Sequence, residues 1–138
     1  MDDELYQNLI ARKEYDIKTM EKIVVTGDIN ISTPVEKTLG TATYSSMDIL
    51  NIIFVNSKCS VENLKKFFFK QLISQLESNK TLAIYRMSYD EFGLDTRKFM
   101  NELKTFETLN LVAIKGGFIE LSSKSAEIVA KYRLNMNL

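Results

Sequence analysis

The sequence predicts an α+β protein that is mostly helical and carries a small antiparallel β-hairpin close to its C-terminus. Apolar residues recur at helical spacing from 96 to 109, with polar residues between them. The pair Gly116-Gly117 separates two short β-rich runs, as in a tight hairpin. Ser60 and Ser122 each precede a helical pattern, in the place that a helix N-cap takes. Together these patterns predict helices that surround a small hairpin.

The composition argues against an enzyme. The chain has 138 residues, of which 45% are hydrophobic, enough for a core. Histidine is absent, which removes the commonest general base and the commonest metal ligand. Cys59 is the single cysteine, so neither an intrachain disulfide nor a zinc-binding spacing is available. Asp90 and Glu91 are expected to be charges at a helix start. We therefore expect no catalytic residues, no metal and no cofactor.

Charge is distributed unevenly along a chain that is neutral in total. Residues 1–57 carry 5 Lys/Arg and 9 Asp/Glu, a net charge of −4. Residues 58–138 carry 13 Lys/Arg and 9 Asp/Glu, a net charge of +4. Because local clustering sets the field at a surface, the basic half could still bind phosphates.

The start of the chain and its apolar runs predict a cytoplasmic protein that neither spans nor binds a membrane. The first residues, MDDELYQN, are acidic and polar, unlike a secretory signal. The longest apolar run, Ile49 to Val55, is far shorter than the about 20 residues that span a bilayer. A single cysteine fits a reducing compartment.

Residues 1–58 are expected to form an N-terminal extension, a possible dimerisation arm, ahead of a domain at 59–138. An interrupted apolar stripe predicts a helix over 3–22, which Thr26-Gly27-Asp28 ends. The segment 28–44 fits either two short strands joined near Pro34 or an irregular arm. For 46–56 we expect a short buried helix capped by Ser46, although its β-branched run would also suit a strand.

A helix is predicted from Ser60 to Gln75, with an apolar stripe wider than one layer of packing requires. The stripe fits a central helix that is covered on several sides. It also fits a dimer interface. The residues that would form such an interface are Phe67, Phe69, Ile73 and Leu76.

The next segment predicts a helix-turn-helix. After a strand or extended link at 81–87, Ser88 is expected to cap a short helix, which Gly93 ends. Asp95 then caps a longer helix over 96–109. On a helical wheel the apolar residues of this helix share one face, which must point to the core: Phe99, Leu103 and Phe106.

The opposite face of the helix at 96–109 is polar and cationic. Arginine can pair with guanine, asparagine with adenine, and lysine and threonine with phosphate. The same residues would also suit an ordinary solvated helix surface. They are Arg97, Asn101, Lys104, Thr105 and Thr108, flanked by Lys98.

A β-hairpin follows this helix. The runs 111–114 and 118–121 are apolar and β-rich, and Lys115-Gly116-Gly117 between them allows the positive φ of a tight turn. The lysine could reach a phosphate or a minor groove, or the hairpin could only close the core. Ser122 or Ser123 then caps a last helix, whose apolar contacts are Ala126, Ile128, Val129 and Tyr132.

The stretch ETLNLVAIKGGFIELSSKSAEIVAKY resembles the end of the winged helix-turn-helix domain in MarR-type and related regulators. That pattern has a Gly-Leu-Ile-like strand start, a basic wing and a Leu-Thr-x-x-Gly-like step into the final helix. Here Asn110 and Ser125 stand where the pattern has glycine, and the wing is very short. Similarity covers roughly 60–133 and extends to small plasmid, viral and archaeal winged-helix proteins, including centromere-binding adaptors of plasmid partition. The resemblance implies the fold more than a function.

The sequence therefore predicts a sequence-specific DNA-binding protein, a transcriptional regulator or a DNA-maintenance factor, that acts as a homodimer on double-stranded DNA. The helix at 96–109 would enter the major groove while the wing contacts backbone or minor groove. The alternative is a winged-helix adaptor that binds protein, with a partner on the N-terminal extension. The expected DNA contacts are Thr96, Arg97, Lys98, Asn101, Lys104, Thr105, Lys115, Gly116 and Gly117.

Overall fold

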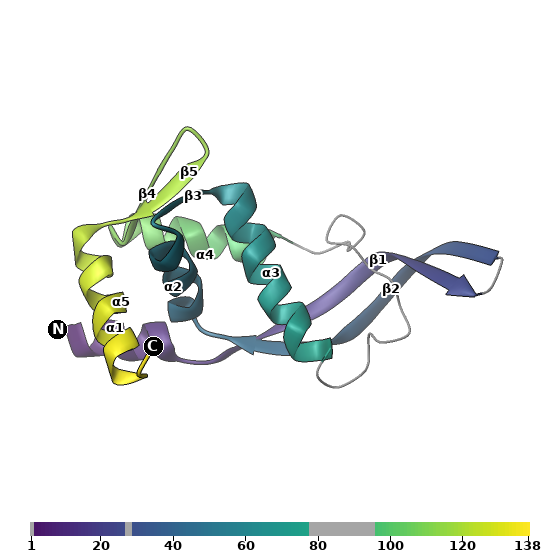
Figure 1. Ribbon diagram of the computed structural model, residues 1–138, viewed down its shortest axis with the longest axis horizontal. Helices are drawn as coiled ribbons and strands as arrows, with labels where there is room; N and C mark the ends of the chain where they lie inside the picture. The colour runs from purple at the N-terminus through teal and green to yellow at the C-terminus, as the bar shows by residue number, and fades with distance from the viewer. Residues whose placement is uncertain (1, 27–28, 78–95) are drawn as a thin grey trace. The chain divides into compact units, whose positions relative to one another are not determined.

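A computed structural model describes residues 2–26, 29–77 and 96–138 (Figure 1). Within these ranges the chain is α+β and mostly helical, with five helices and two antiparallel sheets. This agrees with the fold class that the sequence predicts. None of the helices in the described ranges is both long enough and apolar enough to cross a membrane.

The chain divides into two compact units, and the division does not fall at residue 58. Unit 1 comprises residues 1–12, 45–68 and 97–138, and unit 2 comprises 13–44 and 69–96. Residues 1–58, expected to form an N-terminal extension, therefore contribute to both units. The predicted strand at 81–87, the short helix after Ser88, Gly93 and Asp95 all lie outside the described residues.

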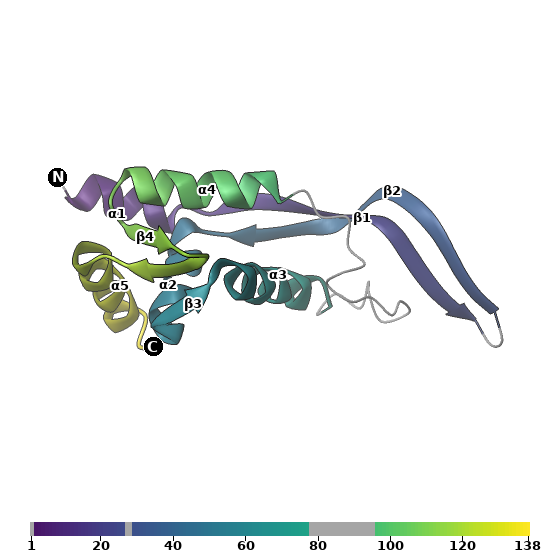
Figure 2. The same cartoon turned by 90° about the horizontal axis from the view of Figure 1, so that it is seen from above.

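Unit 1 contains most of the helices and a three-stranded sheet. In the sheet, β5 lies between β3 and β4 and pairs antiparallel with both. Figures 1 and 2 both show these strands side by side. The elements in chain order are α1 (Asp2–Ile10), α2 (Ser46–Asn56), β3 (Lys58–Ser60), the first part of α3 (Val61–Glu77), α4 (Arg97–Thr108), β4 (Val112–Lys115), β5 (Phe118–Leu121) and α5 (Ser123–Asn135).

The core of unit 1 draws apolar side chains from α2, α3, α4 and the sheet. Phe68 of α3 and Phe99 of α4 stack with ring centroids 5.1 Å apart. Offset stacking of this kind adds to the free energy gained by burying the rings. The other side chains that are almost completely buried include Met47, Ile49, Leu50, Ile53, Leu64, Leu103, Phe106, Leu111 and Ile119.

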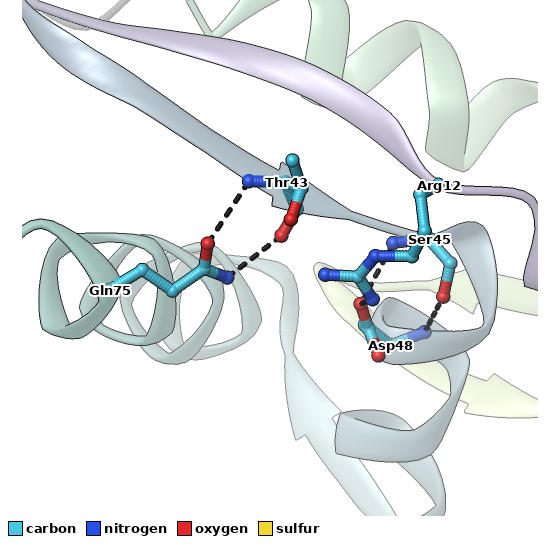
Figure 3. A network of polar contacts seen from close by, with 5 residues as sticks. All are labelled: Arg12, Thr43, Ser45, Asp48 and Gln75. Carbon is cyan, nitrogen blue, oxygen red and sulfur yellow. Dashed lines mark hydrogen bonds and ion pairs between the residues drawn. The ribbon is translucent and has the colours of Figure 1, made fainter.

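Helix α2 confirms the expected helix at 46–56, but its N-cap is Ser45, not Ser46. The Ser45 side chain accepts a hydrogen bond from the Asp48 N–H at 3.2 Å, and the Ser45 N–H donates to Asp48 Oδ2 at 2.8 Å. This reciprocal pair is a capping box. Arg12 Nη1 also lies 2.8 Å from Asp48 Oδ2 (Figure 3). One carboxylate thus binds the residues that flank segment 13–44.

Unit 2 contains a long β-hairpin of β1 (Lys13–Thr26) and β2 (Ile29–Tyr44). The helix predicted over 3–22 is therefore wrong beyond Ile10, because the residues from Lys13 onward pair with β2 instead of continuing α1. The expectation of two strands joined near Pro34 is also wrong. Pro34 lies within β2 opposite Glu21, beside an irregularity in the register, a place where a missing N–H is tolerated.

The base of the hairpin packs on the second part of α3. Tyr15 lies 6.0 Å from Tyr44 and 5.9 Å from Phe69 between ring centroids. Gln75 Nε2 donates to the Thr43 carbonyl at 2.7 Å, and its Oε1 accepts from the Thr43 N–H at 3.0 Å (Figure 3). A side-chain amide thereby satisfies both backbone groups of one strand residue.

Burial bears on the residues expected at a dimer interface. Phe69, Ile73 and Leu76 are buried within the chain. Gly40 of β2 approaches Leu76 so closely that a Cβ there would lie 2.8 Å from Leu76 Cδ2. Only Phe67, with 41% of its surface exposed, is available to a partner without rearrangement. Three of the four residues are therefore packing positions within the chain, and the dimer interface stays a prediction.

Candidate nucleic-acid interface

Helix α4 has two faces that its sequence separates cleanly. Phe99, Leu103 and Phe106 are buried, as their spacing predicts. Because these three side chains fix the rotation of α4, the residues between them must lie on the opposite side. The stacked pair of Phe68 and Phe99 also fixes the helix along its length.

The outward face of α4 carries the residues expected to read DNA. The exposed side chains are Arg97, Lys98, Asn101, Lys104, Thr105 and Thr108, whereas Thr96 is half-buried. The Thr105 hydroxyl donates to the Asn101 carbonyl at 3.0 Å and the Thr108 hydroxyl to the Lys104 carbonyl at 2.9 Å. Both threonines thus use their proton on the helix and present an oxygen lone pair outward.

The acidic residues of α4 lie away from the centre of this face. Ser46 donates its hydroxyl proton to Glu102 Oε1, which draws the half-buried Glu102 towards the start of α2. Glu107 is exposed and lies on the other flank. The centre of the outer face therefore presents cationic and neutral polar groups, the combination that suits phosphates and base edges.

The end of α4 explains the asparagine at position 110. Asn110 has φ +59°, in the left-handed region that usually requires glycine but that asparagine tolerates. The Leu111 N–H donates to the Phe106 carbonyl at 2.8 Å, and the Asn110 N–H donates to the Glu107 carbonyl at 3.0 Å. These two bonds form a Schellman motif, which ends α4 and directs the chain into β4.

The hairpin of β4 and β5, the expected wing, is closed by two glycines, as predicted. Lys115 pairs with Phe118, which leaves Gly116 and Gly117 as the two central residues, with φ of +59° and +80°. Positive φ at both positions is the mark of a type I′ turn. The Gly117 carbonyl accepts the Val61 N–H of α3 at 2.8 Å, so the turn is anchored to a helix start.

The start of α5 holds the other end of the hairpin. Ser122 caps the helix by accepting the Ser125 N–H at 3.2 Å. The Ser122 N–H donates to the Leu111 carbonyl at 2.9 Å, and the buried Ser125 hydroxyl donates to the same carbonyl. Ser125 therefore uses its side chain where the resembled family has a glycine.

Sequence reasoning missed two residues beside the wing, Lys58 and Phe118. Lys58 Nζ lies 5.8 Å from the centre of the Phe118 ring, and both residues are exposed. The alternation of Phe118 and Glu120 with the buried Ile119 could have indicated that Phe118 points outward. Lys58 could not be found in this way, because its place depends on β3 pairing with β5.

The predicted DNA contacts fall on α4 and the wing, which both belong to unit 1, except Thr96, which precedes α4 and belongs to unit 2. Comparison with models of known protein families, with curated proteins and with solved structures finds no match for this chain. Any function assigned to this surface therefore depends on its own geometry and chemistry.

Proposed function

We propose that unit 1 is a winged-helix domain that binds double-stranded DNA in a sequence-specific manner, with α4 in the major groove. The observation that carries this proposal is the outer face of α4, whose exposed Arg97, Asn101 and Lys104 lie opposite a deeply buried apolar face. A helix held this firmly presents its outer side chains in a fixed register, which direct recognition of bases requires.

The order of elements supports the same proposal. Among the described residues, α2, β3, α3, α4, β4 and β5 follow in this order, and β5 lies between β3 and β4. In a winged helix the recognition helix enters the groove while the hairpin that follows it lies beside it on the DNA backbone. In this protein those elements are α4 and the wing.

Each predicted contact has a chemical role. Arg97 would donate two hydrogen bonds to guanine O6 and N7, and Asn101 would bind adenine N6 and N7. Lys104 and Lys115 would hold phosphates, with backbone N–H groups of the glycine turn close to the same strand. A homodimer would place two such helices in successive major grooves, about one helical turn apart. Regulation of transcription and DNA maintenance are both uses of such a complex.

A protein-binding adaptor is the second candidate, because unit 1 also exposes apolar residues at the ends of α2 and α5. Val55, Leu134 and Leu138 each leave at least 60% of their surface exposed. Exposed apolar side chains become buried when a partner protein covers them, and patches of them are common at protein interfaces. An adaptor of this kind could bind DNA as well.

The first experiment is a selection of binding sites from random duplex DNA, followed by measurement of affinity at several salt concentrations. The double variant Arg97→Ala, Lys104→Ala should weaken binding to the selected site by at least about ten-fold. It should also lower the salt slope by about 1, because Lys104 is the phosphate contact that is lost, and relax the preference for guanine that Arg97 provides.

The matched control is Lys70→Ala, Lys131→Ala, which removes the same charge from exposed positions on other helices. It should leave both the affinity and the salt slope nearly unchanged. Equal losses in the two double variants would mean that binding is non-specific attraction to the whole chain. Unchanged affinity in the α4 variant would show that this helix does not read DNA.

A further inference from the structure

The outer face of the three-stranded sheet carries an aromatic residue between lysines. Phe118 is the first residue of β5 and pairs with Lys115 on one side and with Ser60 on the other. Residues paired directly across an antiparallel sheet point to the same face. Residues two apart on one strand also share a face, which places Lys58 and Glu120 there as well.

Among the described phenylalanines of unit 1, only Phe118 and Phe67 are exposed, and only Phe118 lies on the sheet. Phe68, Phe99 and Phe106 are almost completely buried, whereas Phe118 leaves 48% of its surface exposed. The ammonium group of Lys58 lies over its ring at 5.8 Å, a favourable cation–π distance. The packing of the wing does not require an aromatic ring here, because Ile119 and Val112 fill the core side of the sheet.

We propose that this sheet face, defined by Lys58, Phe118 and Lys115, binds an unpaired nucleobase of DNA. The base stacks on the Phe118 ring, and the two lysines hold the phosphates on either side of it. The proposal deepens the proposed function and depends on it. It names the substrate as duplex DNA that continues into a single strand, with α4 on the duplex and the sheet face on the first unpaired nucleotide.

The chemistry of the face favours a nucleotide over an apolar protein segment. Stacking on an aromatic ring is available to every base, and cationic groups beside the ring match the phosphates of a single strand. Glu120 is the one carboxylate among the described residues of this face, and it pairs in register with Lys58. Two ammonium groups against one carboxylate leave a net positive charge beside the ring.

The test measures fluorescence anisotropy with a labelled duplex that contains the selected binding site and ends in a short single-stranded thymidine overhang. A second probe has the same overhang but lacks the base at the first unpaired position. The wild-type protein should bind the complete overhang roughly ten-fold more tightly than the abasic one, from loss of one stacked base. Phe118→Ala should remove this difference, and Phe118→Tyr should restore it because the ring is retained.

Two further variants separate the roles of ring and charge. Phe118→Leu keeps an apolar side chain without a ring and should behave as Phe118→Ala does. Lys58→Ala should weaken binding to both overhang probes alike and leave affinity for the blunt duplex unchanged. Circular dichroism of each variant checks that the exposed substitutions leave the fold intact.

The outcomes distinguish this inference from the proposed function. If the wild-type protein binds the blunt duplex through α4 but shows no preference between the two overhang probes, the sheet-face site is wrong and the proposed function stands. If the base preference survives in Phe118→Ala, the unpaired base binds elsewhere and the inference is again wrong. If no probe binds, both proposals fail together.

Discussion

The two units of this chain are held together in different ways. In unit 1, side chains from helices and strands far apart in the sequence meet in one core, and Phe68, Phe99 and Leu103 are almost completely buried in it. In unit 2, the described side chains pack at the base of a hairpin, where Tyr15 contacts Tyr44 and Phe69. Among the described side chains, those of unit 1 form a core that draws on many elements, and those of unit 2 gather where the base of the hairpin meets α3.

This difference indicates which part of the molecule can hold side chains firmly enough to recognise a ligand. A surface that reads bases must hold its side chains within fractions of an ångström, which requires a well-packed support. Helix α4 has that support on its whole inner face. A two-stranded sheet has only limited stability of its own, so the hairpin of β1 and β2 should open locally at a lower free energy than the core of unit 1.

The largest loss of stability is expected from Phe106→Ala, which tests the packed core of unit 1. The ring is 2% exposed and lies under the end of α4. Its loss should reduce the free energy of unfolding by about 3–5 kcal/mol, from lost burial and the cavity left behind. Urea denaturation followed by circular dichroism measures the change. Leu109→Ala, at the exposed end of the same helix, should change stability by less than about 0.5 kcal/mol. Similar losses in both variants would contradict the two-faced description of α4.

A smaller and local effect is expected from Gln75→Ala. The variant loses both hydrogen bonds to the Thr43 backbone, at a cost of about 1–2 kcal/mol. Amide hydrogen exchange should show faster exchange at Thr43 and its neighbours at the base of the hairpin, with amides of α4 unaffected. Gln71→Ala, at an exposed position one turn earlier on α3, serves as the matched control. If exchange rises equally in α4, the two units open as one, and the contrast between them does not hold.

The smallest effect concerns alkaline pH. Burial raises the pKa of the Cys59 thiol above its ordinary value of 9.0. The native state therefore keeps this proton at a pH where the unfolded chain has begun to lose it. Well below pH 9.0 the thiol is protonated in both states and contributes no pH dependence. As pH rises above that value, stability should fall.

Denaturant midpoints measured across this alkaline range test the prediction. Cys59→Ala removes the titrating thiol and should show a shallower decline than the wild type. The wild-type thiol should also react slowly with an alkylating reagent at neutral pH, because the thiolate is the reactive form. Rapid alkylation of the folded protein would contradict the burial of Cys59.

The elements of the candidate interface could be predicted because their signals are local. The spacing of Phe99, Leu103 and Phe106 defines the inner face of one helix, and Gly116-Gly117 defines one turn. These patterns involve residues close together in the sequence. No knowledge of the rest of the chain is needed to interpret them.

The hairpin of unit 2 could not be predicted in the same way, because strand pairing is not local. Ile17 and Met20 can be placed on a helical stripe with Leu9, although the charged and apolar residues of 14–18 also alternate with a period of two. Only the pairing with β2 decides between the two patterns. The contacts of Ser46 with Glu102 and of Lys58 with Phe118 were missed for the same reason.

The carboxylate of Asp48 has an architectural consequence. Lys13 and Tyr44 are paired, so the hairpin leaves and re-enters at neighbouring points, and the flanking Arg12 and Ser45 both bind Asp48. The two ends of the hairpin are therefore held by one and the same side chain. The hairpin could therefore change in length or sequence during evolution without displacing the start of α2.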